Sequence, residues 1–497
     1  MCRTEVNVLL LLPSEVITPN NPPTGWGILG DIYSRGWQRT DNTNNFLSFF
    51  ATFAYSFKNR YVVNANVRND ASNVFGQDIN HRIDPTYSFG LSWRASEEAF
   101  FQKHLKWITT LNFRGTFGIQ GNALTRESPE LILSQQGVQP GYNRYFSTIG
   151  QIPNPYLSWE RTRNWNFGVD LELFRMFYMN LEYYTRRSNA VITVDLPFEY
   201  GIDDMKRNGG IIYNRGIEYT LSFTPIQKRD FSLNINLNAS KNWNKGGETK
   251  IDRNTAMYLR GGSTQILKEG YPLSAFWSYS FAGLDGSNGK PMFNYVEVPD
   301  EEKSKSIDPT TYLVYSGETE PYFTGGLGFS FRYKSLSLNT SFSLLLGSKK
   351  RLPSPYSDFQ GSGSMMPDPT KNVNRDLLNR WQKPGDEVYT NIPGLPTWPI
   401  EIGWTLPNTD SAESSIKMWE QSDAMVVSGS FLRCRNIGLS WQMKKEWCDK
   451  IHAKNLAINF NMDNIFVIAS KRFNGFDPEL ENSIMPRSFS LGLNIGF

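Results

Sequence analysis

Apolar and small polar residues alternate strictly over long stretches of this chain. In the last nine residues, 489–497, every odd position is large and apolar, and every even position is Ser, Gly or Asn. This pattern predicts a β-strand with one apolar face and one polar face, because successive side chains of a strand point to opposite sides. The same alternation marks residues 49–57, 87–93, 165–173, 231–240, 336–344 and 456–460.

The lengths of these segments favour a membrane barrel over a soluble β-sandwich. The alternating runs cover about 9–12 residues, as membrane-spanning strands need, whereas strands of soluble proteins mostly have about 5–6. We therefore predict an all-β fold, an antiparallel transmembrane β-barrel, with a soluble sandwich as a distant alternative. Aromatic residues near the ends of the runs suit the interfacial girdles of such barrels: Trp93, Trp107, Trp165, Tyr183, Tyr184, Trp441 and Phe497.

Short and long connections alternate along the chain, as in outer-membrane barrels, where the long connections are extracellular. The predicted tight turns are 58–60, 175–176, 225–230 and 334–335. The predicted long segments are 69–86, 119–163, 187–212, 242–273, 299–324, 347–428 and 463–487.

The number of strands predicts an incomplete barrel. About fifteen strands lie between Phe46 and Phe497, whereas bacterial single-chain barrels close with an even number. The first and the last strand then run in the same direction, so an antiparallel barrel does not close between them. Either Gly25–Arg35 adds a strand, or these strands are the rear part of a larger barrel.

Composition excludes several classes of protein. The 51 Lys and Arg nearly balance the 48 Asp and Glu, giving a net charge of +3, which argues against a nucleic-acid partner. A mean hydropathy of −0.44 argues against a polytopic helical membrane protein. Three cysteines imply no disulfide framework, although a Cys434–Cys448 bridge stays open.

No arrangement of residues suggests a metal, a cofactor or catalysis. The three histidines are far apart, and neither a phosphate-binding loop nor a zinc motif is present. Adjacent carboxylates at Asp203–Asp204 and Asp300–Glu302 fit solvated loop charges better than an acid–base pair. We therefore expect no enzyme, no catalytic residues and no cofactor.

Alternation also places a set of polar side chains on the face that would line the barrel lumen. They suit either a hydrated passage for polar solutes or packing against a domain inside the barrel, and the two interpretations weigh equally. These residues are Asn64, Asn66, Arg68, Asn112, Arg114, Asn166, Asp170, Glu172, Asn180, Glu182, Asn234, Asn236 and Asn238.

Aromatic residues in the long segments are candidate substrate contacts, since flat rings pack against the apolar faces of sugars. For any single residue, anchoring of the loop is the more common role. The candidates are Tyr142, Tyr145, Tyr156, Tyr271, Tyr356, Trp381 and Trp398. The closing strand, with Phe489, Leu491, Leu493, Ile495 and Phe497, is a candidate membrane-insertion signal as well as a structural strand.

An ordered series of segments resembles the C-terminal barrel region of SusC/RagA-type TonB-dependent outer-membrane transporters. It includes an N-P-Y-L-S-W-E segment at 154–160, R-W-Q-K-P-G-D at 380–386 and G-F-D-P-E at 475–479. The resemblance covers residues 45–497, whereas residues 1–44 show none and fit a false start or a remnant. We do not read the apolar run Val8–Leu12 as a targeting segment. The remaining segments are 55–62, 67–76, 88–100, 111–122, 214–218 and 431–437.

The resemblance implies a location, partners and a job. Such transporters lie in the outer membrane of Gram-negative, Bacteroidetes-like bacteria and import glycans or peptides. A SusD-like surface lipoprotein helps to capture the oligosaccharide or peptide, and the TonB complex supplies energy through an N-terminal plug. We find no plug or TonB-contacting segment and expect a fragment embedded in outer-membrane lipid. The alternative is a barrel-anchored adhesin or glycan-binding protein without active transport.

Overall fold

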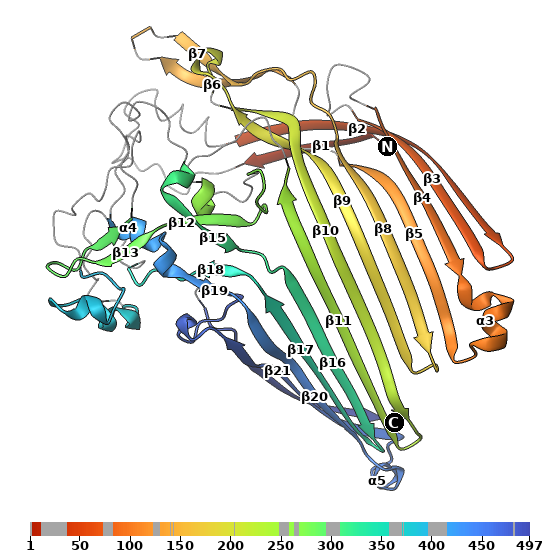
Figure 1. Ribbon diagram of the computed structural model, residues 1–497. Helices are drawn as coiled ribbons and strands as arrows, with labels where there is room; N and C mark the ends of the chain where they lie inside the picture. Colours follow the sequence, from red (N-terminus) through yellow and green to blue (C-terminus); the bar gives the residue numbers. More distant parts are fainter. Residues whose placement is uncertain are drawn as a thin grey trace, which may run out of the picture.

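The computed structural model describes most of the chain and consists mainly of β-strands (Figure 1). Three short α-helices are present among the described residues, α3 (Ala99–His104), α4 (Ser415–Glu420) and α5 (Lys445–Asp449). None of the helices described is long and apolar enough to cross a membrane. The described residues are 2–10, 37–72, 83–122, 130–139, 141–142, 144–202, 204–247, 258–262, 268–294, 309–356, 370, 372–395, 415–480 and 483–497.

One antiparallel sheet of fourteen strands forms the body of the molecule. Each strand pairs with the strands that precede and follow it in the sheet, so the topology is that of an up-and-down barrel wall. The strands, in order, are β1 (Cys2–Leu10), β2 (Trp37–Phe57), β3 (Tyr61–Ser72), β4 (Ile83–Arg94), β5 (Ile108–Asn122), β8 (Glu160–Leu173), β9 (Phe177–Asp195), β10 (Asp204–Gln227), β11 (Phe231–Gly246), β16 (Phe323–Tyr333), β17 (Leu336–Leu346), β20 (Phe431–Gln442), β21 (Asn455–Ala469) and β22 (Ser488–Gly496).

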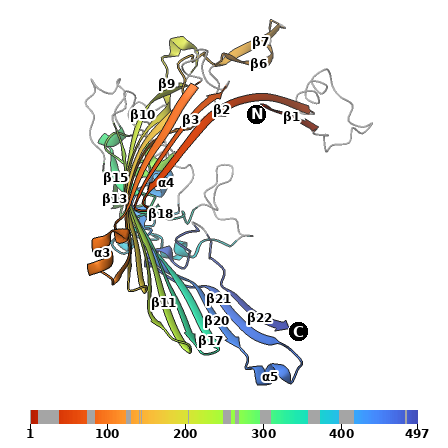
Figure 2. The same ribbon diagram turned by 90° about the vertical axis from the view of Figure 1, so that its right-hand side faces the viewer.

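The sheet is curved and open, which confirms the predicted incomplete barrel. Figure 2 shows it as an arc whose edge strands, β1 and β22, do not meet. Within the described residues β1 pairs with β2 alone, and β22 pairs with β21 alone. Strands β2 to β22 number thirteen, so β2 and β22 run in the same direction, as predicted. The possible extra strand at Gly25–Arg35 lies outside the described residues.

Among the described residues the main sheet has thirteen strands from β2 to β22, slightly fewer than the predicted count of about fifteen. Residues between Leu273 and Pro299, which the sequence pattern leaves outside the long loops, form β12 (Ala275–Tyr279), β13 (Phe281–Leu284) and β14 (Pro291–Phe293). These strands pair with one another or with β15 (Leu313–Glu318) and not with the main sheet. Short alternation alone cannot distinguish a wall strand from a loop strand.

The tight turns lie at one end of the sheet, together with α3 and α5 (Figure 1). Positive φ angles at Lys58 and Asn59, at Phe174 and Arg175, and at Lys334 reverse the chain within two or three residues, as predicted. The turn predicted at 225–230 is shorter, because β10 continues to Gln227.

The predicted loop 187–212 is wrong, since most of it is strand. Strand β9 continues to Asp195 and β10 begins at Asp204, with Asp204 opposite Asp195 and Tyr213 opposite Arg187. The residues 191–194 are Val, Ile, Thr and Val, which favour extended structure. Their pairing with β10 keeps this segment extended although polar residues surround it. The β9–β10 hairpin is therefore longer than the neighbouring hairpins of the sheet.

The other long connections build a loop unit at the opposite end of the sheet (Figure 1). Its strand pairs are β12–β15, β13–β14, and β18 (Lys349–Arg351) with β19 (Val426–Ser428). A separate hairpin joins β6 (Ile132–Gln139) and β7 (Arg144–Gln151). Cys434 and Cys448 are both buried and free, so the disulfide that the sequence left open is not formed.

Candidate functional site

Polar side chains on the inner face of strands β5, β8 and β9 form one connected network. Arg114 lies 3.0 Å (Nε) from an Asp170 carboxylate oxygen and 2.8 Å (Nη2) from a Glu182 carboxylate oxygen. Asn112 and Asn180 donate to the two oxygens of Asp170, at 3.0 and 2.7 Å. Cross-strand register explains this, because Asp170 lies directly opposite both Asn112 and Asn180. The predicted luminal residues therefore meet and satisfy one another.

The opposite face of the same strands is apolar and exposed. Phe113, Trp165 and Phe167 have exposed side chains although they are large and apolar. Trp93 stacks on Phe113 with ring centroids 5.6 Å apart. A continuous surface of this kind, backed by a polar inner face, is the arrangement of a lipid-facing barrel wall.

Two of the predicted contact residues form part of the loop-unit cores. Tyr356 is 1% exposed, packs against Trp419, and its hydroxyl donates to the Pro393 carbonyl. Burial raises the pKa of Tyr356 well above its usual range. Tyr271 packs against Trp277 and Tyr315, with ring centroids 4.9 and 5.2 Å away. These rings hold the loop unit together, and Tyr356 is closed to a ligand in this conformation.

Arg351, a half-buried arginine of strand β18, makes hydrogen bonds to the core that contains Trp277. The Arg351 guanidinium donates to the carbonyls of Arg260 and Trp277, at 2.8 and 3.1 Å, and to the Ser278 hydroxyl. Burial, with a smaller contribution from the charge of Arg260, lowers the pKa of Arg351 to about 10. The core that positions Tyr271 is therefore fastened by hydrogen bonds as well as by aromatic packing.

The remaining predicted contact residues are spread over separate connections. Tyr142, in the β6–β7 turn, and Tyr156, before β8, are 75% and 77% exposed. The side chain of Tyr145 and all of Trp398 lie outside the described residues. The structure therefore brings no two of the exposed tyrosines into a shared, enclosed site.

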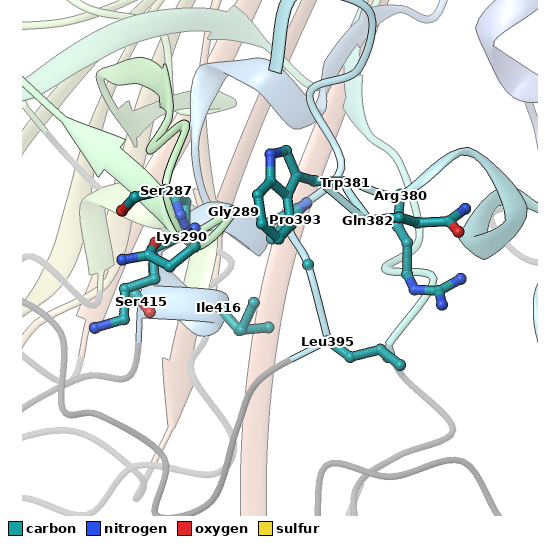
Figure 3. A pocket seen from close by; sticks show the side chains of 13 residues that line it. Ser287, Gly289, Lys290, Arg380, Trp381, Gln382, Pro393, Leu395, Ser415 and Ile416 are labelled. Carbon is teal, nitrogen blue, oxygen red and sulfur yellow. Dashed lines mark hydrogen bonds between the residues drawn. The ribbon is translucent and has the colours of Figure 1, made fainter. Parts of the chain in front are cut away.

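Trp381 borders a cavity of about 570 Å³ in the loop unit (Figure 3). The cavity is formed by three loop segments and the start of α4, which are far apart in sequence. A volume of several hundred Å³ is in the range of small-ligand sites. The lining segments are 287–291, 380–382, 393–395 and 415–416.

The position of Trp381 is fixed by two glycines and a carboxylate. A Cβ at Gly289 would lie 2.3 Å from the indole, and one at Gly394 would lie 3.0 Å from it, so the ring packs directly on the backbone. Gly289 has a φ of +71°, which closes the turn that Asp285 begins. The indole Nε1 donates to Glu387 at 3.2 Å. Close backbone packing of this kind needs residues without a side chain.

Among the described residues that line the cavity, the charged side chains are both positive. Lys290 and Arg380 both line it, on opposite sides of Trp381 (Figure 3). Glu387 accepts hydrogen bonds from its own and the Gly385 backbone amides and from Trp381, and these bonds lower the pKa of Glu387 below its usual value. The Glu387 carboxylate thus stays ionised, and its hydrogen bonds stabilise the loop instead of placing a negative charge in the cavity.

Sequence reasoning selected Trp381 but missed Lys290 and Arg380. Arg380 directly precedes the predicted contact residue Trp381, and Lys290 ends the turn Asp285–Lys290. A basic residue next to an aromatic residue or at the end of a turn is the local signal that could have identified them. Their shared location follows from contacts between segments about 90 residues apart, which no local pattern reveals. Among the described residues, no group of three His, Cys, Asp or Glu side chains is arranged to hold a metal ion.

Comparison with known proteins identifies the family. Residues 13–344 match the family model described as TonB dependent receptor-like, beta-barrel. The chain belongs to this family. It is therefore an outer-membrane β-barrel protein of the TonB-dependent receptor type, and the relatives that it matches are receptors and not enzymes. The apolar outer face and the polar inner face agree with such a barrel.

Relatives within the TonB-dependent receptor family are longer than this chain. TonB-dependent receptor P3 of Formosa agariphila is 23% identical, over 92% of this chain and 46% of the relative. TonB-dependent receptor SusC of Bacteroides thetaiotaomicron is 25% identical, over 91% of this chain and 44% of the relative. The chain spans about half the length of the curated relatives that it matches.

Solved structures agree on the fold. A chain of the RagAB peptide transporter superimposes with a TM-score of 0.73 at 22% identity, covering 98% of this chain and 50% of that chain. A chain of the RagAB peptide importer in its "open-open" state gives a TM-score of 0.70, covering 93% and 48%. These matches confirm the barrel fold that the sequence predicts.

The closing strand of this receptor-type sheet presents the predicted insertion residues together. Phe489, Leu491, Leu493 and Phe497 are at least 60% exposed and lie with Ile495 along the free edge of β22. The Lys454 side chain donates to the carbonyl of Phe497 at 3.0 Å, which fixes the end of the chain against β21. Recognition of this strand during insertion stays a prediction.

Proposed function

We propose that this chain supplies the wall and the long loops of an importer that takes up glycans or peptides across the outer membrane. In this proposal a SusD-like surface lipoprotein helps to capture the solute at the long-loop end, and the TonB complex energises its passage. The chain corresponds to the rear part of the receptor barrel. Family membership supports the proposal, as does similarity to SusC and to the RagAB peptide transporter.

The observation that carries the proposal is the connected polar network on the inner face. Arg114 forms ion pairs with both Asp170 and Glu182 across three neighbouring strands, and with two carboxylates to one guanidinium the group keeps a net negative charge. Such a polar, hydrogen-bonded lining suits the passage of hydrated polar solutes. The loop unit adds a ligand-sized cavity at the end where solutes would enter.

Uptake by living cells tests the importer. The gene is deleted from its bacterium and restored from a plasmid, and uptake of fluorescent oligosaccharides and peptides is followed with and without a protonophore. We expect the restored strain to take up the label, and we expect the protonophore to abolish this uptake. When the receptor is purified in mild detergent, we expect a surface lipoprotein to co-purify with it. Uptake that is unchanged by the deletion would refute the importer.

A surface adhesin is the second candidate, because Tyr142 and Tyr156 expose most of their rings at the long-loop end. Exposed tyrosines are common anchors in binding surfaces. In the same assay an adhesin would bind the labelled solute at the cell surface, resist the protonophore, and deliver nothing to the periplasm. Fractionation of the label between surface and periplasm separates the two functions.

A further inference from the structure

The cavity beside Trp381 is lined by cationic side chains and by no carboxylate among the described residues. Lys290 comes from the turn after β13, and Arg380 comes from the segment that follows the short helix η6 (Arg375–Asn379). Figure 3 shows the two side chains on either side of the indole of Trp381. Two positive charges that flank a flat ring favour an anionic ligand over a neutral or cationic one.

Three nearby carboxylates are already engaged by the loops themselves. Asp285 accepts from the backbone and hydroxyl of Ser287, at 2.8 and 2.7 Å. Asp386 accepts from the backbone amides of Gln382 and Lys383, both at 3.0 Å. Glu387 accepts from Gly385 and Trp381. Since these oxygens point into the turns, they shape the cavity without being part of its lining.

Arg380 keeps donors for a ligand. A guanidinium has five N–H donors, and one contact within the described residues is from Nη1 to the Leu377 carbonyl, at 2.9 Å. This contact holds the side chain in place, and the other N–H groups of the guanidinium stay available to a ligand. Arginine in such a position is suited to carboxylate and sulfate groups, which accept two parallel hydrogen bonds.

The uncharged part of the lining suits a sugar. Trp381 is half-buried and offers an apolar surface against which the C–H face of a pyranose ring packs. Gln382, Asn288 and Ser287 also line the cavity. Each already makes a hydrogen bond within the loops, and the N–H and oxygen positions that remain can donate to or accept from sugar hydroxyls.

We propose that this cavity binds anionic oligosaccharides, with a carboxylate or sulfate at Lys290 and Arg380 and a sugar ring against Trp381. The inference rests on the proposed import function and specifies the class of substrate. Carboxylate and sulfate share the chemistry that the two cations recognise, so both types of sugar are probes of one site.

Direct binding to the intact receptor, purified from its own outer membrane, tests the inference. Calorimetric titration at low salt compares tetragalacturonate, its uncharged methyl ester, a sulfated carrageenan tetrasaccharide and a tetra-aspartate peptide. We expect at least one acidic sugar to bind, and the ester to bind at least about tenfold more weakly, as the loss of a charged hydrogen bond predicts.

Variants locate the binding. Arg380→Gln and Lys290→Gln are each expected to weaken the acidic sugar about tenfold and to leave the ester unchanged. Trp381→Ala weakens both. Lys383→Gln is the matched control, because Lys383 is exposed in the same loop but does not line the cavity. Each variant is used only if it migrates as folded barrel on an unheated gel.

Several results would overturn the inference. The first two are that neither acidic sugar binds, or that the acid and its ester bind with equal affinity. The others are that Lys383→Gln weakens binding as much as Arg380→Gln and Lys290→Gln do, or that tetra-aspartate binds as tightly as the sugars. Uptake assays on the same strain keep the two proposals apart. Uptake of other solutes without acidic-sugar binding refutes only the cavity, whereas binding without any uptake refutes only the importer.

Discussion

Arg433 of strand β20 and Asp477 of the β21–β22 connection form a buried, two-oxygen ion pair. Arg433 Nη2 lies 2.6 Å from Oδ1 and 2.7 Å from Oδ2 of Asp477, and the side chains are 2% and 5% exposed. Arg433 Nε also forms an ion pair with Glu479 at 2.9 Å, and Glu479 accepts a hydrogen bond from Arg435. The network fastens a long connection to the end of a wall strand.

Removal of one partner of this pair is expected to release the connection. Asp477→Ala leaves the buried guanidinium of Arg433 with only Glu479, which Arg435 shares, and breaking a buried pair costs up to about 3–5 kcal/mol. Hydrogen exchange of residues 470–480 should therefore become much faster, while the wall strands stay protected. Asp449→Ala, an exposed carboxylate in α5, is the control. A double variant Arg433→Met, Asp477→Leu should regain most of the protection, and failure to do so would show that charge pairing is not the cause.

A second close contact predicts a cost for one added methyl group. Asp84 of β4 is 1% exposed and accepts from Arg161 of β8 at 2.7 Å, across the intervening strand β5. It reaches Arg161 because β5 carries Gly121 there, where a Cβ would lie 1.7 Å from an Asp84 oxygen. Gly121→Ala is expected to lose about 1–3 kcal/mol, as overpacking does.

The temperature at which the folded band disappears on a gel measures this loss. Gly90→Ala on β4 is the matched control, since its nearest neighbour would lie 3.4 Å away, at ordinary contact distance. Equal transition temperatures for the two alanine variants would mean that Asp84 moves aside without loss.

The wall of the molecule could be predicted from sequence, and the loop unit could not. Alternation at 165–173 fixes which side chains share a face, because a strand has a period of two, and Asp170 and Trp165 indeed lie on opposite faces. Tyr356 and Trp381 look alike in sequence, yet one is buried and the other borders a cavity. The difference arises from contacts between distant segments, which the local pattern does not encode.

Gly289 is expected to be needed for the position of Trp381. Gly289→Ala places a Cβ 2.3 Å from the indole and also puts alanine at a φ of +71°. Gly201→Ala is a close control, because Gly201 has the same φ but nothing within 4 Å of its Cβ position. Both variants bear the backbone cost, roughly 1–2 kcal/mol, and only Gly289→Ala should speed hydrogen exchange at 380–387. Equal exchange in both would exclude a steric role of the indole.

Acid is expected to loosen the loop that carries Trp381. Amide and indole donors hold the pKa of Glu387 below its ordinary value of 4.5. Because the folded pKa lies below the unfolded one, the carboxylate stabilises the loop above about pH 4.5, and this contribution is lost as the pH falls through the folded pKa. A spin label at the exposed position 383 should therefore become more mobile on acidification.

Glu387→Gln tests the assignment of this pH dependence. We expect the label to be mobile at neutral pH in this variant, with little further change on acidification. Glu446→Gln, an exposed carboxylate at the short-turn end, should behave like the parent protein. An unchanged pH response in Glu387→Gln would assign the loosening to another group.

The aromatic end of the chain is expected to promote membrane insertion. Deletion of Phe497 shortens the exposed apolar row of β22, which pairs with β21 alone among the described strands, and should lower the amount of receptor recovered in the outer membrane. The deletion also removes the carbonyl that accepts from Lys454. Lys454→Met therefore serves as the control, since methionine has no N–H donor and loses the same hydrogen bond while the ring is kept. Normal outer-membrane yield after the deletion would show that insertion does not depend on Phe497, and equal losses in both variants would assign the effect to the hydrogen bond.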